Sequence, residues 1–327
     1  MRGKRLGLAL WGTEPVAALA EHAALAERIG FESVWVIDSQ LLCREVTITL
    51  AAILARTTHL RVATGVTQPI TRHASVMASA MATLDEMFPG RTIMGIGTGF
   101  SSLRTIGLPQ ARIATVEAYI ATVRALLRGN GADFGGTRGR LAWVDKPLNV
   151  PIVVAATGPR MTRSAAEHAD GVILHQGLSP ELLARGVALT RESGRTIEVS
   201  CWAPYSMGAN AAEARDRVRA RVAGALINAR PEWFDGAERA AVERLHAEYD
   251  VRHHAGAEPE HAAIVPDSLV DRYALAGAPA DLRAQFARLL DQPGLDRIIL
   301  TPQVTGPGAM PLDTVLRAFD TDVLSRL

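Results

Sequence analysis

The feature that most constrains the fold is a repeat of short apolar runs, each followed by an amphipathic stretch of helical spacing. Eight such runs occur, at residues 6–11, 33–37, 60–66, 91–96, 151–156, 171–175, 197–202 and 296–300. They are apolar at nearly every position rather than at alternate ones, which is typical of parallel strands covered on both faces. Eight strand-then-helix units favour a closed (β/α)₈ TIM barrel, an α/β fold, over a doubly wound open sheet.

Residues that begin and end helices occur where the repeat needs them. Thr13 is expected to cap a helix with Pro15 in its first turn, and Gly30 closes that helix. Ser179 and Pro180 predict another helix start of the same kind. The remaining helices are expected at residues 45–57, 72–87, 111–128, 160–169, 211–229 and from 311 onward.

One segment interrupts the repeat. Residues 231–266, between the seventh and eighth strands, are rich in Glu, His and Pro, and we expect a helical insertion on the barrel rim. The segment holds four histidines: His246, His253, His254 and His261. Their spacing matches no standard ligand set, so a solvated surface is favoured over a metal site. No linker marks a boundary elsewhere, and a barrel can use the whole length, so residues 1–327 are predicted to form a single domain.

Charge and cysteine content exclude several classes of protein. Lys and Arg total 35 and Asp and Glu total 34, so no strong field is available to attract nucleic acid or an anionic membrane. No run of 18 apolar residues is present, and residues 6–11 indicate a first strand rather than a signal peptide. The two cysteines, Cys43 and Cys201, are too few for a disulfide framework, and such a low cysteine content is typical of cytoplasmic proteins. Both side chains are expected to pack in the interior.

In a TIM barrel, function concentrates in the loops that follow the strands. Residues 95–100 (GIGTGF) lack the third glycine of a dinucleotide-binding fingerprint, so we expect a backbone that approaches a flat ring or phosphate, with a tight turn as the alternative. Residues 157–160 (TGPR) open a helix, where N–H groups, a hydroxyl and an arginine suit a phosphate. The alternative there is an ordinary helix start with a solvated arginine.

Three further positions are candidates for chemistry. Asp38 ends the second strand and could bind a ring edge, donate a proton, or only cap the next segment. His175 ends the sixth strand and points either into the barrel mouth or into packing. Arg72 and His73 open the third helix, where a surface pair is at least as well supported as a functional one.

Several segments together carry a resemblance to a known family: FESVWVIDSQ (31–40), LRVATGVTQP (60–69) with Arg72 and His73, ATLDE (82–86), GRTIMGIG (90–97), SLRTIG (102–107), AATGPRM (155–161), ADGVI (169–173), PDSLVDRY (266–273) and AGAP (276–279). In order and spacing the chain resembles the bacterial-luciferase-like superfamily of flavin and deazaflavin oxidoreductases. Within it, the chain is similar to the F420-dependent branch and to methylenetetrahydromethanopterin-reductase-like proteins. The resemblance spans nearly the whole chain.

The resemblance implies a site for coenzyme F420, an 8-hydroxy-5-deazaflavin, at the barrel mouth. Gly65 and Val66 would carry a bulge with a non-prolyl cis peptide that backs the ring, and Asp38 matches the acidic position near the reactive region. The rest of the implied cofactor-binding set comprises Thr67, Gly97 and Thr98 beside the ring and Ala156, Thr157, Gly158, Pro159 and Arg160 on the phosphate side. No metal is implied, and relatives commonly form homodimers.

Two departures from the family pattern bear on mechanism. Many relatives have histidine where this chain has Ser39, and many have an acid where it has Phe100. Asp38 and His175 therefore remain as candidate catalytic acids, and the loop at Phe100 is expected to be more apolar. The resemblance implies hydride transfer between the deazaflavin C5 and a C=C, C=N or C=O carbon of a small-molecule substrate. An FMN-dependent monooxygenase and a non-catalytic flavin-binding barrel are the alternatives.

Overall fold

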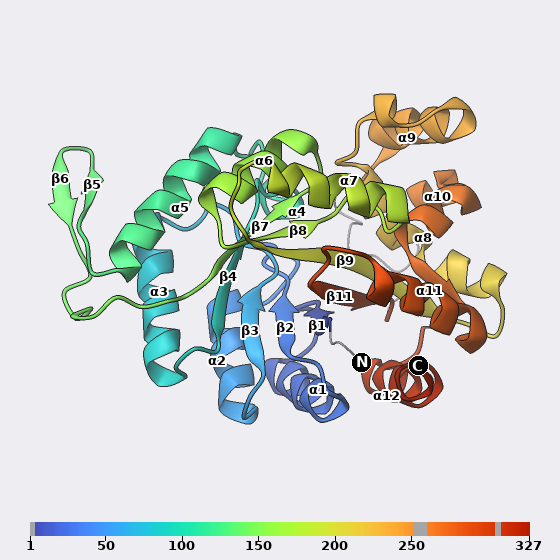
Figure 1. Ribbon diagram of the computed structural model, residues 1–327, viewed down its shortest axis with the longest axis horizontal. Coiled ribbons are helices and arrows are strands. Elements are labelled where there is room, and N and C mark those ends of the chain that lie inside the picture. Colours follow the sequence, from blue (N-terminus) through green and yellow to red (C-terminus); the bar gives the residue numbers. More distant parts are fainter. Residues whose placement is uncertain (1–3, 251–259, 305–308) are drawn as a thin grey trace.

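A closed parallel barrel forms the centre of the molecule. The computed structural model describes residues 4–250, 260–304 and 309–327. In this part of the chain, barrel strands lie in the order β9-β11-β1-β2-β3-β4-β7-β8, and β8 pairs with β9 to close the ring (Figure 1). These strands are β1 (Arg5–Leu10), β2 (Ser33–Val36), β3 (Arg61–Thr64), β4 (Thr92–Ile96), β7 (Ile152–Ala156), β8 (Gly171–Leu174), β9 (Glu198–Met207) and β11 (Arg297–Pro302). Each predicted run is a strand, so the predicted (β/α)₈ barrel is confirmed.

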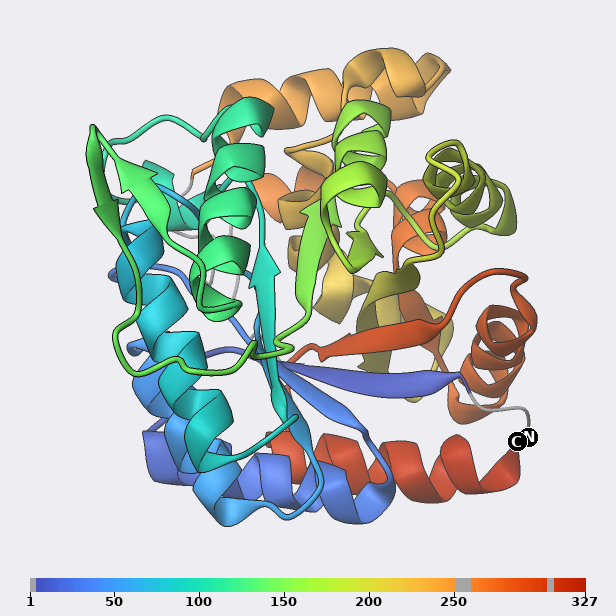
Figure 2. The same ribbon diagram turned by 60° about the vertical axis from the view of Figure 1, so that its left-hand side comes forward.

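Helices surround the barrel, as Figure 2 shows. The main ones are α1 (Val16–Ile29), α2 (Val46–Arg56), α3 (Ala74–Met87), α5 (Ile113–Leu127), α6 (Pro159–His168), α7 (Pro180–Arg191), α8 (Ala211–Leu226), α11 (Pro279–Asp291) and α12 (Leu312–Asp322). Each predicted helix lies within a few residues of its expected range. In the described residues, no helix is both long enough and apolar enough to cross a membrane.

The ends of the helices confirm some predictions and correct others. Gly30 closes α1 as predicted: at φ 104° its N–H reaches the carbonyls of Ala26 and Glu27. Thr13 does not cap that helix, because Pro15 occupies the N-cap position and no side chain accepts from the first turn. The Ser179 hydroxyl likewise makes no capping bond to α7, although Ser179 stands at its N-cap. The capping bond predicted for Thr13 is therefore absent, whereas the predicted helix start at Ser179 and Pro180 is confirmed without a hydroxyl bond.

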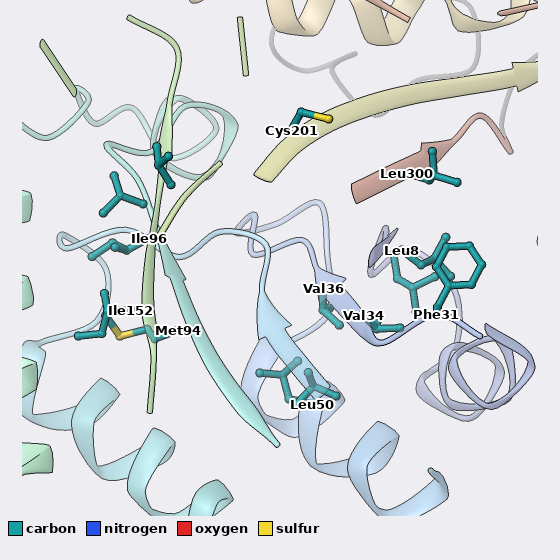
Figure 3. Close-up of a cluster of buried hydrophobic side chains, with 14 of the residues drawn as sticks. Leu8, Phe31, Val34, Val36, Leu50, Met94, Ile96, Ile152, Cys201 and Leu300 are labelled. Atoms are coloured by element: carbon teal, nitrogen blue, oxygen red, sulfur yellow. The ribbon is translucent and has the colours of Figure 1, made fainter. Parts of the chain in front are cut away.

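Alternation along each strand divides the core into two layers. Leu8, Val34 and Val36 point outward to the helices, and Figure 3 shows the two valines near Leu50 of α2. The intervening residues point into the barrel and form a separate cluster: Ala9, Trp35, Ala63, Ile93, Val153, Ile173 and Ile299. Because both faces of each strand are buried, the strands carry apolar residues at successive positions.

Several elements were not predicted, among them α10 (Asp267–Tyr273) and α11 between the insertion and β11. A hairpin of β5 (Ala132–Phe134) and β6 (Thr137–Gly139) projects beyond α5 in both ribbon views. A short helix, α4 (Ser101–Arg104), follows β4, and β10 (Leu275–Gly277) pairs with the far end of β9. The hairpin did have a local signal in Gly135–Gly136, whose positive φ values of 68° and 91° form its turn.

The rim insertion is helical where it is described. It contains η1 (Pro231–Trp233), α9 (Gly236–Glu248) and η3 (Glu260–Ile264), followed by α10 (Asp267–Tyr273). Its apolar side chains form a cluster with α8. Its histidines are not all solvated, because His261 is buried with its ring 4.2 Å from that of Tyr249. His253 and His254 lie outside the described residues, and His246 contacts the Leu226 carbonyl.

Candidate active site at the barrel mouth

One cavity opens at the C-terminal ends of the barrel strands. It has a volume of about 220 Å³. Residues at the ends of β1, β2, β3, β4, β7, β8, β9 and β11 all contribute to its lining, together with one face of α8. This position agrees with the general rule that TIM-barrel sites are built from the loops after the strands.

Small and apolar side chains make the floor of this cavity. Val66, Ala155 and Trp202 lie directly on the inner barrel cluster, and Gly65 and Gly97 line the cavity beside them. The predicted cis peptide between Gly65 and Val66 is present. A Cβ on Gly97 would stand 3.2 Å from Val66 Cγ2, so a side chain there would crowd the floor. The residues present therefore fit a flat ring laid against the end of the barrel.

Asp38 lies on the wall of the cavity in a dense network. Its Oδ1 accepts a hydrogen bond from Gln40 Nε2 at 3.1 Å, and its Oδ2 accepts from Arg72 Nη1. Arg72 also donates through Nη2 to Glu45 at 2.9 Å. Burial raises the pKa of Asp38 above its usual value, although the charge of Arg72 acts in the opposite direction. Arg72 is thus part of the site rather than of a surface pair, whereas His73 caps α3 through Ser75.

His175 faces the cavity from the end of β8. Its ring stands edge-on to that of Trp202, with the centroids 6.4 Å apart. Burial lowers the pKa of His175 to about 4. The imidazole is therefore neutral at physiological pH, because burial disfavours its cationic form. The sequence left open whether His175 points into the barrel mouth or into packing, and the structure places its side chain at the mouth.

The start of α6 forms one side of the mouth. Gly158 is the N-cap, no side chain caps the helix, and Pro159 occupies its first turn. Thr157 lines both the main cavity and a smaller one of about 50 Å³ that contains Pro159, Arg185, Trp233 and Arg272. A Cβ on Gly158 would stand 3.1 Å from Trp233 Cη2, so the insertion covers this turn closely.

The predicted cofactor-binding residues do not all reach the cavity. Asp38, Gly65, Val66, Gly97, Thr98, Thr157 and His175 line the main cavity. Thr67 and Ala156 are buried and line neither cavity, Gly158 also lines neither, and Arg160 is exposed and lines neither. The arginines that border the smaller cavity are Arg185 and Arg272, which sequence reasoning did not single out.

Sequence reasoning also missed one wall of the main cavity. Arg221 of α8 projects over the ring of Trp11, with its Cζ 4.0 Å from the ring centroid. Its Nε donates to Gln303 Oε1 at 2.9 Å. Alternating arginines at 215, 217, 219 and 221 gave no local signal for which one turns inward. Only the packing of α8 against the barrel distinguishes Arg221 from the others.

Comparison with known proteins adds independent information. The model of the family described as luciferase-like monooxygenase matches residues 4–297. A 5,10-methylenetetrahydromethanopterin reductase from Methanolobus tindarius is 28% identical over 306 residues, which cover 87% of this chain and 90% of the relative. An F420-dependent glucose-6-phosphate dehydrogenase from Nakamurella multipartita is 35% identical over 182 residues, or 50% of this chain and 53% of the relative.

The fold has close counterparts among solved structures. The coenzyme F420 dependent tetrahydromethanopterin reductase from Methanopyrus kandleri superposes with a TM-score of 0.80. The superposition covers 98% of this chain and 99% of that one at 21% sequence identity. Both chains therefore share one barrel architecture over their whole matched length.

Proposed function

The chain belongs to the luciferase-like monooxygenase family, and from this premise we propose that it is an F420-dependent oxidoreductase acting on a small-molecule substrate. The observation that carries the proposal is the floor of small and apolar residues at Gly65, Val66, Gly97 and Ala155, which suits a flat ring. The relatives named as F420-dependent support the deazaflavin over FMN. When bound, reduced F420 supplies a hydride from its C5 to an electrophilic C=C, C=N or C=O carbon.

Asp38 is the proposed source of the proton that the substrate's partner atom takes up. Its carboxyl group lines the cavity, and burial raises its pKa, which favours the protonated form that a general acid needs. Gln40 and Arg72 hold its two oxygens in place. Because a displaced donor loses much of its effect, this fixed geometry is as important as the pKa.

His175 takes a different role in the proposal. With a pKa of about 4 it is neutral at the pH of the cell, so it cannot carry a spare proton into the site. A neutral ring N–H can still donate a hydrogen bond and orient a substrate oxygen or nitrogen. We therefore propose His175 as an orienting group rather than as the acid.

The start of α6 is proposed to hold the phosphate of the cofactor. Its first turn presents N–H groups that no side chain caps, and these favour an anion. Thr157 reaches both cavities and would connect the ring to its tail. Arg185 borders the smaller cavity and would contribute positive charge there, whereas the charge of Arg272 is already balanced by Glu238 and Arg160 lies further out.

A titration of the purified protein with F420 and, separately, with FMN tests this function. We expect F420 to bind with a change in its visible absorbance and FMN to bind weakly. Tight FMN binding together with oxygen consumption by reduced FMN would instead identify a monooxygenase. F420 binding without turnover of any C=C, C=N or C=O compound in a broad screen would favour a binding protein.

We also propose that residues 1–327 act as a single domain and that the chain forms a homodimer. In support of one domain, the insertion packs on α8, and β10 extends the sheet through β9. In support of a dimer, exposed apolar side chains gather near the starts of α2 and α3, among them Leu41, Ile48 and Val76. Sedimentation of the wild type and of Val76→Glu tests the dimer, which the substitution should weaken.

A further inference from the structure

Arg221 is the charged group of the main cavity that has no opposite charge beside it. The other charged side chain in the lining, Asp38, is engaged by Arg72. Within the described ranges, no carboxylate forms an ion pair with Arg221, and its hydrogen bond goes to the neutral amide of Gln303. Every other arginine of α8, at positions 215, 217 and 219, pairs with an acid.

The surroundings of Arg221 make this unpaired charge costly. Its guanidinium lies on the Trp11 ring, and among the described residues the titratable groups whose charge acts on it are Tyr249 and Cys43. Burial raises the pKa of both, so each stays neutral at physiological pH. Burial also lowers the pKa of Arg221 to about 10, which still leaves it cationic at neutral pH. A cation kept in such a place is stabilised best by an anion that arrives from solution.

The guanidinium is also held ready for a ligand. Stacking on Trp11 fixes the plane of the group, and Gln303 Oε1 accepts a hydrogen bond from Nε. The Nη groups have no acceptor among the described residues, while Arg221 lines the cavity. The two Nη groups together suit an oxyanion, and the immobilised guanidinium reduces the entropy lost on binding.

The position of Arg221 in the barrel separates it from the proposed phosphate site. Trp11 follows β1, and Gln303 follows β11, its neighbour in the ring. The start of α6 follows β7, which stands four strands from β1 in either direction around the eight-stranded barrel. Arg221 and α6 therefore occupy opposite walls, with the apolar floor between them. An anion bound at Arg221 would therefore belong to a molecule on the side of the cofactor ring that faces away from the cofactor's phosphate.

We propose that Arg221 is the substrate-anchoring residue of this site, and that the substrate carries an oxyanion group, in first place a carboxylate, which Arg221 binds on the wall opposite α6. The inference rests on the proposed function, since it treats the remaining volume of the cavity as the substrate's. It names a substrate class, a small anionic electrophile. It requires no oxidant or reductant beyond the proposed cofactor.

Calorimetric titration with benzoate, and with its neutral counterpart benzamide, tests the proposal on the full chain with and without F420. We expect benzoate to bind the wild type more tightly than benzamide, and Arg221→Met to weaken benzoate binding about tenfold or more. Arg215→Met removes the same charge from the same helix, at its pair with Asp271, and should leave benzoate binding unchanged. Inorganic phosphate in a parallel titration tells whether a tetrahedral oxyanion binds as well as a planar one.

Thermal unfolding keeps the test interpretable. Because the substitution removes a buried charge while methionine keeps the contact with Trp11, Arg221→Met should unfold at a temperature no lower than that of the wild type. Equal benzoate affinity in the wild type and Arg221→Met would overturn the proposal. So would loss of F420 binding in Arg221→Met with benzoate binding retained, since Arg221 would then serve the cofactor. Failure of the wild type to bind F420 would instead contradict the proposed function, while the benzoate comparison would still stand.

Discussion

Arg72 and Asp38 are 34 residues apart in the sequence, yet Arg72 Nη1 donates directly to Asp38 Oδ2 at the barrel mouth. The second Nη of Arg72 reaches Glu45, so one guanidinium links the end of β2 to the start of α2. Because β2 and β3 are neighbours, the loops that follow them bring these groups together. The pair controls the protonation of the carboxyl group that we propose as the acid.

Arg72→Met and Glu45→Gln should shift the pKa of Asp38 in opposite directions. The charge of Arg72 lowers that pKa and the charge of Glu45 raises it, so removing Arg72 raises it and removing Glu45 lowers it. A general acid loses activity as the pH rises through its pKa. The decline in kcat/KM at high pH should therefore move upward in Arg72→Met and downward in Glu45→Gln. Shifts of the same sign in both variants would contradict the assignment of Asp38 as the acid.

Gly158→Val should abolish binding of the cofactor's phosphate. The new Cβ would stand 3.1 Å from Trp233 Cη2 and would also crowd the first turn of α6. We expect F420 affinity, measured by fluorescence quenching, to fall by about tenfold or more. The double variant Gly158→Val, Trp233→Ala removes the clash with the ring. If F420 affinity returns in the double variant, the loss came from displacing Trp233 rather than from blocking the anion.

His175 should make folding stability depend on pH at values above those at which ordinary carboxylates titrate. Its pKa is about 4 in the folded protein and about 6.5 in the unfolded chain, so only the unfolded state takes up its proton between these values. Stability is thus lost as the pH falls through that window, by about 2 kcal/mol between pH 7 and pH 5. Urea unfolding at both pH values should show a smaller loss in His175→Gln. His168→Gln, a change at an exposed ring, should keep the wild-type loss.

Local patterns were enough to predict the barrel, because each strand-and-helix unit contains its own signals. Gly30 ends α1 through its own backbone, and the alternation of Leu8 and Ala9 into two layers follows from the pleat. The capping bond predicted for Thr13 is absent for a local reason as well. A proline at the helix start fixes φ but leaves the preceding Thr13 and Ser179 side chains free to turn elsewhere.

The site could be predicted only where it belongs to the loop after a strand. Asp38, Gly65 and Thr157 satisfy that condition, and all three line the cavity. Arg221 does not, because it lies within a helix and reaches the cavity only through the packing of α8 against the barrel. Arg160 differs in the opposite way: it follows a loop after a strand, but in the first turn of α6 it is exposed and lines neither cavity.

The opposite end of the barrel offers a test of stability that is independent of function. Arg297 is fully buried there and donates to Glu198 Oε1 at 2.8 Å and to Ser33 Oγ at 2.6 Å. Arg5 also pairs with Glu198, at 2.7 Å, and the charge of Arg61 interacts with those of Glu198 and Arg297. Glu198 therefore lies at the centre of these guanidinium groups, with Glu32 as a second acid 3.9 Å from Arg5, and it holds its negative charge because Arg297 lowers its pKa despite burial.

Glu198→Ala should accordingly destabilise the fold by about 3–5 kcal/mol, because it leaves a buried cation unpaired beside two like charges. Glu21→Ala removes the partner of Arg56 at an exposed pair and should leave the urea midpoint near that of the wild type. Glu198→Leu combined with Arg297→Met replaces the buried pair by apolar groups and should recover part of the lost stability. If the double variant is no more stable than Glu198→Ala, the loss reflects the remaining contacts of Glu198, such as Arg5, rather than the unpaired charge of Arg297.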